Sequence, residues 1–100
     1  MCGIYGITAK DPEFIQSFID ICKHRGPDGE RVWWDDKVTL GHNLLSIMAN
    51  PDLSRQPWKT PKGNILVYNG EIFNYYNLKK KYNGKGFAGI TGCDTELLPW

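Results

Sequence analysis

Apolar positions recur with two different spacings along the chain, which divides it into short strands and short helices. A β-prone run over residues 4–7, bracketed by glycines, predicts a buried strand near the N-terminus. Asp11 followed by proline is a good helix start, and apolar residues then recur every three or four positions. This pattern predicts an amphipathic helix over residues 12–23. The helix should end at the glycines and proline of "HRGPDG", residues 24–29.

The middle of the chain indicates strands and loops. Residues 32–34 and 38–42 predict two strands that turn at the pair Asp35-Asp36. Residues 49–63 contain three prolines and few periodic apolar positions, which predicts a long loop of the kind that is often functional. A continuous apolar strand over residues 65–68 should then stop abruptly at Asn69-Gly70.

The last third of the chain predicts a helix around residues 75–82, a glycine-rich strand over 84–89 and a helix that opens at Thr95. The order of these elements contains no run of strand-helix-strand units, so the fold class is expected to be α+β. The final helix would be too short to be stable alone. We therefore expect residues 1–100 to form one domain that is the N-terminal part of a longer one.

Composition removes several classes of partner. The formal net charge is +1, which gives no field for nucleic acid or an anionic membrane. No apolar run approaches the roughly 20 residues that span a bilayer, and the N-terminus does not resemble a signal peptide. Three cysteines without close pairing favour reduced thiols, so a cytoplasmic location is expected.

Cys2 becomes chemically distinctive if Met1 is removed, and a small second residue of this kind favours that removal. The thiol would then sit on the same residue as a free α-amino group, whose pKa is about 7.7 to 8.0. Nucleophilic catalysis needs a base beside the nucleophile, and the amine supplies one without a histidine.

Asn69 and Gly70 are candidates for stabilising an oxyanion. A side-chain amide next to an exposed backbone N–H can bind the charge that develops on an attacked carbonyl oxygen. The alternative is that Asn-Gly is a plain tight turn, because this dipeptide is also the strongest short turn signal.

Six strings, in order, resemble the class-II glutamine amidotransferase domain of the asparagine synthetase type: "MCGIYGI", "HRGPD", "GHNLLSI", "QPW", "VYNGEIFNY" and "CDTELL". The resemblance implies an N-terminal nucleophile hydrolase fold, in which two antiparallel sheets lie between helical layers (αββα). It also implies the reaction, in which the terminal cysteine attacks the side-chain amide of glutamine, releases ammonia and leaves a thioester that water cleaves.

The resemblance assigns roles to individual residues. Cys2 matches the nucleophile, and Asn69 and Gly70 match the oxyanion-binding pair. Glu71 matches an acidic residue that helps to hold substrate, and Asp94 matches the aspartate that binds the α-amino group of glutamine. No metal and no cofactor is implied.

Other polar and aromatic residues are expected to build the structure around the site. Arg25 and Gly26 belong to a loop that shapes the site wall in the family, and His24 and Asp28 are expected to build the same loop. His42 and Cys22 are expected to be packed residues rather than a base or a nucleophile. Four aromatic residues are expected in the core or the wall: Trp33, Trp34, Phe73 and Tyr75. The adjacent tryptophans cannot share one face of a strand.

Leu44 departs from the family pattern. Family members usually have an arginine here that binds the α-carboxylate of glutamine, and leucine cannot replace a guanidinium group. Three explanations remain open: Arg55 or Arg25 compensates, the substrate lacks that carboxylate, or the domain is a silent relative that binds a partner or metabolite.

Length is the second departure, because no nucleotide-binding loop follows. The ammonia-accepting, ATP-dependent synthetase domain is therefore expected as a separate chain or as a missing part. A small zinc protein that uses Cys22, His24 and Cys93 is a further alternative, although the spacing of these residues is poor for zinc.

Overall fold

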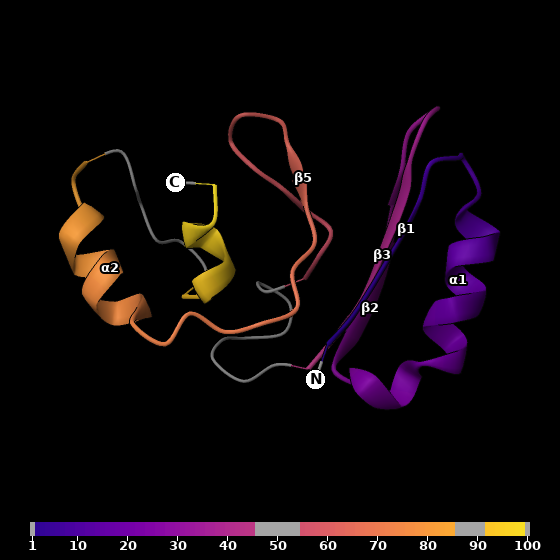
Figure 1. Cartoon of the computed structure of the whole chain (residues 1–100), viewed down its shortest axis with the longest axis horizontal. Coiled ribbons are helices and arrows are strands. Elements are labelled where there is room, and N and C mark those ends of the chain that lie inside the picture. Colours follow the sequence, from indigo (N-terminus) through magenta and orange to yellow (C-terminus); the bar gives the residue numbers. More distant parts are fainter. Residues whose placement is uncertain (1, 46–54, 86–91, 100) are drawn as a thin grey trace.

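The computed structural model describes residues 2–45, 55–85 and 92–99. Among the described residues every strand pairs antiparallel with its neighbour, and α1 joins β1 to β2 across the intervening β3, so the expected α+β class is confirmed (Figure 1). In chain order the elements are β1 (Gly3–Ile7), α1 (Pro12–Ile21), the 3-10 helix η1 (Lys23–Arg25), β2 (Gly29–Trp34), β3 (Thr39–Leu44), β4 (Trp58–Lys59), β5 (Ile65–Leu66), α2 (Tyr75–Tyr82) and the 3-10 helix η2 (Asp94–Leu97).

The main sheet is antiparallel, with β3 between β1 and β2. Figure 1 shows α1 on one side of this sheet and the β4–β5 pair on the other, followed by η2 and α2. Helix, sheet, second sheet and helix thus follow one another along the long axis of the molecule. This order agrees with the layered arrangement that the sequence predicts.

Helix α1 covers the main sheet because apolar side chains recur along one side of it. Asp11 caps the helix by accepting a hydrogen bond from the Phe14 N–H at 3.1 Å. Ile15 and Ile19 are buried against the sheet. They can approach closely because Gly41 stands opposite them, where a Cβ atom would lie 2.5 Å from Ile15 Cγ2.

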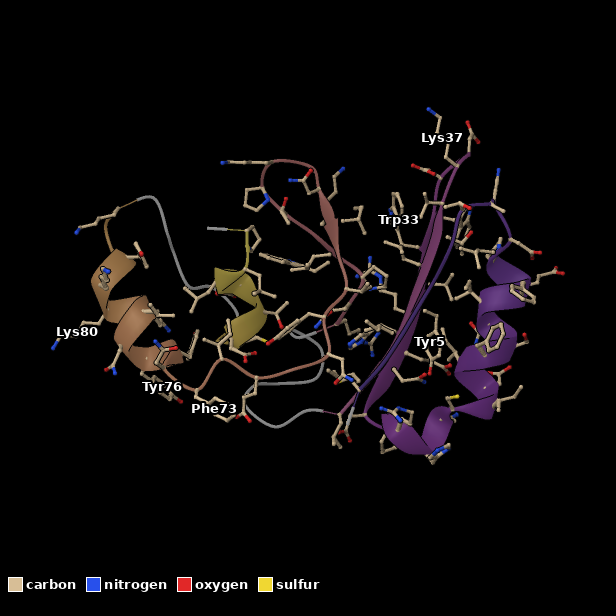
Figure 2. The ribbon with its side chains drawn as sticks, viewed as in Figure 1. Tyr5, Trp33, Lys37, Phe73, Tyr76 and Lys80 are labelled. Atoms are coloured by element: carbon tan, nitrogen blue, oxygen red, sulfur yellow. The ribbon has the colours of Figure 1, made fainter. Side chains whose placement is uncertain are left out.

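Side chains of the main sheet alternate between two faces. Figure 2 shows Tyr5 on the α1 side and Trp33 on the opposite side. Asn43 also faces α1, since its amide donates to the Ile19 carbonyl at 3.4 Å. We call the opposite face, which is turned toward β4 and β5, the inner face.

A second apolar cluster lies between α2 and η2. Its buried members are Tyr75 and Leu97, and Ile72 and Leu78 pack against them. This cluster confirms Tyr75 as a core residue.

Phe73 corrects one expectation, because it is 94% exposed rather than part of the core or wall. It lies in the turn before α2. The residue before it, Ile72, packs against the cluster, and the Phe73 side chain points outward (Figure 2). Trp34 is also largely exposed, whereas Trp33 is partly buried on the other face.

Element boundaries differ from the predicted ones where pairing between distant segments decides them. β2 begins three residues earlier than expected and β3 extends to Leu44, because the ladder between these strands continues to the pair Gly29 and Leu44. β4 lies inside the expected loop 49–63 and pairs with β5, of which only Ile65–Leu66 are strand. Helix α1 ends at Ile21, before the short η1.

Helix α2 matches its prediction, and η2 begins one residue before the predicted start. The expected strand over 84–89 falls mostly outside the described residues. Across the described ranges, no helix is long and apolar enough to cross a membrane.

Candidate active site

Cys2 lies immediately before β1, at the edge where this strand meets the end of β3. Its sulfur accepts a hydrogen bond from the Leu45 N–H at 3.3 Å, and the Leu45 carbonyl oxygen is 3.7 Å away. The thiol is half-buried. The backbone of the neighbouring strand therefore fixes the sulfur at one end of the sheet.

The loop 24–29, which is expected to form a wall of the site, lies against the end of β3. Asp28 N–H donates to the Leu44 carbonyl at 2.9 Å, so the loop continues along the end of β3. Gly26 is buried against this strand, and a Cβ atom there would lie 2.5 Å from the carbonyl carbon of Asn43. Only a glycine allows this contact between two backbones.

Arg25 belongs to the same loop, but its side chain is exposed. Burial raises the pKa of the Tyr5 hydroxyl and the Cys22 thiol raises it further, whereas the positive charge of Arg25 opposes both. Since Tyr5 faces α1, the charge of Arg25 acts on the side of the sheet away from the inner face.

Tyr68 precedes the Asn69-Gly70 pair, and both polar atoms of its backbone are bound. Its N–H donates to Gln56 Oε1 at 2.6 Å. Its carbonyl oxygen lies 3.3 Å from His42 Nε2, and since a carbonyl only accepts, this nitrogen carries the proton. The segment that leads into the expected oxyanion-binding pair is thereby attached to the inner face of β3.

His42 is fully buried, in agreement with the expectation of a packed strand residue. Burial lowers the pKa of its imidazole, and the hydrogen bond to the Tyr68 carbonyl offsets this only in part. Nδ1 has no hydrogen-bond partner among the described residues. The ring is consequently neutral and acts as a donor toward Tyr68.

The ring of Tyr68 lies next to the other expected site residues. A Cβ atom on Gly70 would lie 2.7 Å from Tyr68 Cζ, so the ring covers the Gly70 backbone. Burial raises the pKa of the Tyr68 hydroxyl, and the negative charges of Asp94 and Glu71 raise it further. Two carboxylates from separate segments therefore lie near one aromatic ring.

Asp94 is buried at the start of η2. Its Oδ2 accepts a hydrogen bond from the Ile72 N–H at 2.7 Å, just beyond the Asn69-Gly70 turn. Glu71, between them, is exposed. The other oxygen of Asp94, Oδ1, accepts from the Cys93 thiol at 3.7 Å, so both oxygens of the carboxylate are held by neighbouring groups.

Gln56 connects these segments and is 5% exposed. In addition to its bond with Tyr68, its Nε2 donates to Thr95 Oγ1 at 3.4 Å, in η2. Neither Gln56 nor Tyr68 is predicted from the sequence as a site residue. Their roles depend on contacts between segments 12 and 39 residues apart, and the only signals in the sequence are the strings "QPW" and "VYNGEIFNY" that contain them.

The zinc alternative is wrong for the described residues, where no group of three metal-binding side chains occurs. Cys22 caps α1 next to Tyr5, whereas Cys93 precedes η2 beyond the β4–β5 pair (Figure 1). Cys22 is also only half-buried, so it is not the fully packed core residue that was expected.

The main sheet thus carries a cysteine at one strand end, and the segment that leads into the Asn-Gly pair is attached to the same sheet through Tyr68 and His42. A family model described as "Glutamine amidotransferase domain" matches residues 1–99. The chain therefore belongs to the glutamine amidotransferase family, and the predicted family is confirmed.

Relatives of the chain include glutamine-hydrolysing asparagine synthetases. Asparagine synthetase 1 of Bacillus subtilis is 33% identical over 106 residues, which cover 98% of this chain and 17% of the relative. Asparagine synthetase B of Escherichia coli is 30% identical over 105 residues, covering 98% and 19%. The enzyme of Brassica oleracea is 33% identical over 101 residues, covering 94% and 17%. The chain thus spans about a fifth of the length of these relatives.

Proposed function

We propose that the chain is a glutaminase domain that releases ammonia from the side-chain amide of glutamine. The observation that supports this most is the attachment of the Asn69-Gly70 segment to the inner face of β3, through Tyr68 and His42, on the sheet that holds Cys2. The family match to residues 1–99 supports the same reaction.

The reaction begins once Met1 has been removed. The α-amino group of Cys2 takes the thiol proton, and the sulfur attacks the amide carbon of glutamine. Asn69 Nδ2 and the Gly70 N–H donate to the oxyanion that forms. The protonated amine then gives its proton to the leaving nitrogen, the C–N bond breaks, and ammonia departs to leave a glutamyl thioester.

Water completes the cycle. The amine, again unprotonated, accepts a proton from water as the oxygen attacks the thioester carbon, and the C–S bond breaks. Glutamate leaves and Cys2 regains its proton. Asp94 binds the α-ammonium group of the substrate through Oδ1, which also accepts from the Cys93 thiol at 3.7 Å, and Glu71 contributes to holding it.

Access to the nucleophile is consistent with this assignment. Ile4, two residues from Cys2 on the same face by alternation, is 48% exposed, so the inner face is open beside the thiol. A free thiol needs a reducing compartment, and we place the reaction in the cytoplasm. The ammonia acceptor is proposed to be an ATP-dependent synthetase unit, as in the asparagine synthetase relatives, present on another chain or elsewhere on the same protein.

The test is ammonia release from glutamine by protein whose intact mass shows that Met1 is absent. We expect turnover by the wild type and a loss of at least about 1000-fold in Cys2→Ala, because the covalent step is removed. A matched sample that retains Met1 should be equally inactive, since its amine is blocked. Equal release by wild type and Cys2→Ala would contradict the proposal, and silence of both would favour the alternative of a non-catalytic binding protein.

A further inference from the structure

One row of residues crosses the main sheet at the end that holds the nucleophile. The ladders pair Gly3 with Asn43 and Gly29 with Leu44. Continuing the first ladder by one residue places Cys2 opposite Leu44. The row therefore reads Cys2, Leu44, Gly29, with one residue from each strand, and alternation turns all three toward the inner face.

Arg55 lies at the far end of this row. A Cβ atom built on Gly29 would lie 3.7 Å from Leu44 Cβ and 3.9 Å from Arg55 Nε. The guanidinium group therefore approaches the glycine at the position where any other residue would place a side chain. Leu44 itself is 5% exposed, whereas the side chain of Arg55 is exposed.

The length of the row matches the length of a substrate. Neighbouring strands lie about 4.8 Å apart, so Cys2 and Gly29 are separated by about 10 Å. In extended glutamine the amide carbon and the carboxylate carbon are about 5 Å apart across four bonds. The sulfur attacks from about 3 Å, and a guanidinium-carboxylate hydrogen bond adds about 2.8 Å. An extended glutamine whose amide lies at Cys2 thus brings its carboxylate to Arg55.

We propose that Arg55 binds the α-carboxylate of the substrate, a role that leucine at position 44 cannot perform. The proposal rests on the glutaminase function proposed above. It narrows the substrates to α-amino acids that have a side-chain amide and a free α-carboxylate. Arg55 suits this role because its planar fork can hold both carboxylate oxygens. Arg55 is favoured over Arg25 because its Nε lies beside Gly29 in this row.

The experiment compares two substrates with the full-length protein that lacks Met1. One is glutamine, and the other is 4-aminobutanamide, which is glutamine without its carboxylate. Ammonia release gives kcat and KM for each, in the wild type and in Arg55→Gln. The substitution is at an exposed position, so folding should be preserved, and circular dichroism checks this.

We expect the wild type to prefer glutamine by about 10- to 100-fold in kcat/KM, the range for a charge-assisted hydrogen bond. Arg55→Gln should raise KM for glutamine by that factor with little change in kcat, and should leave the kinetics with 4-aminobutanamide unchanged. Arg55→Lys should recover part of the preference, because it restores the charge without the fork.

The matched control is Arg31→Gln, which removes the same charge from the inner face of the sheet at β2, two residue pairs further along the ladder than Gly29. It should leave the preference intact. An active enzyme whose preference for glutamine survives in Arg55→Gln, or falls equally in Arg31→Gln, would overturn the assignment of Arg55 alone. Absence of ammonia from either substrate in the wild type would overturn the glutaminase function together with it.

Discussion

At the scale of single residues, Gly26 lets the loop 24–29 lie directly against β3 because it has no side chain. The backbone of the loop lies against the backbone of β3 at this point, and an added Cβ atom would be 2.7 Å from the Leu44 carbonyl carbon. Neither partner is a flexible side chain that could move aside. The contact between the loop 24–29 and β3 therefore tolerates no other residue at position 26.

Gly26→Ala should lower the free energy of unfolding by about 1–3 kcal/mol, the usual effect of overpacking a buried contact. Gly29→Ala, in the same loop, is the control, because its Cβ atom would meet nothing closer than 3.7 Å. It should change stability by less than about 0.5 kcal/mol. Urea unfolding measures both, and equal losses would contradict the proposed backbone contact.

The sequence alone identifies those site residues whose chemical role depends only on their own position in the chain or on their immediate neighbours. Cys2 is distinctive because of its position, and Asn69-Gly70 because of its dipeptide, so both could be recognised without a structure. Gln56 could not, since an amide in a proline-rich segment has no evident role until the chain brings Tyr68 beside it. Arg55 could be named only as one of two candidate arginines, because its position beside Gly29 depends on the fold. Leucine at position 44 raises the question of which residue binds the α-carboxylate. The proposal of Arg55 required the register of the sheet, which the sequence does not give.

At the scale of elements, predictability follows the range of the interactions. Helix α1 begins where its cap residue predicts, because the Asp11 bond to Phe14 spans three residues. β4 was missed because a two-residue strand exists only through its partner β5. The end of β5 is equally dependent on distant groups, since Tyr68 is bound by Gln56 and His42 rather than by a strand ladder.

Gln56→Met tests this arrangement, since it keeps the volume and removes both hydrogen bonds. The buried Tyr68 N–H would lose its acceptor, which should cost about 1–3 kcal/mol of unfolding free energy. Displacement of the following oxyanion pair should lower kcat by about 10- to 100-fold. Unfolding and ammonia release are measured on the same preparation.

Thr95→Val is the comparison variant for Gln56, since it leaves the bond to Tyr68 and removes the link from Gln56 to η2, together with the contact of the Cys93 thiol with Thr95 Oγ1 at 3.4 Å. It should cost about 0.5–1.5 kcal/mol. Because η2 contains Asp94, the variant should raise KM and leave kcat nearly unchanged. If Gln56→Met also altered KM alone, Gln56 would act through η2 and not through Tyr68.

At the scale of the whole molecule, two apolar clusters are joined through polar groups. One cluster is Ile15 and Ile19 under the sheet, and the other surrounds Tyr75 and Leu97. His42 links the sheet to the strand end that leads to the second cluster. The candidate site lies at this junction. The attachment of its Asn69-Gly70 segment to the sheet therefore depends on His42, which can be protonated.

Stability should consequently depend on pH through His42. The ordinary pKa of the group is 6.5, and burial lowers the pKa in the folded state. Below pH 6.5 the unfolded chain therefore binds more protons than the folded one, which favours unfolding. The contribution of neutral His42 is fully present above pH 6.5 and is lost as the pH falls from 6.5 toward the folded pKa. Urea unfolding at pH 8, 6.5 and 5 should show this decline in the wild type. His42→Gln, whose amide can still donate to the Tyr68 carbonyl but does not titrate, should show a shallower one. Parallel curves for the two proteins would show that His42 does not supply the pH dependence.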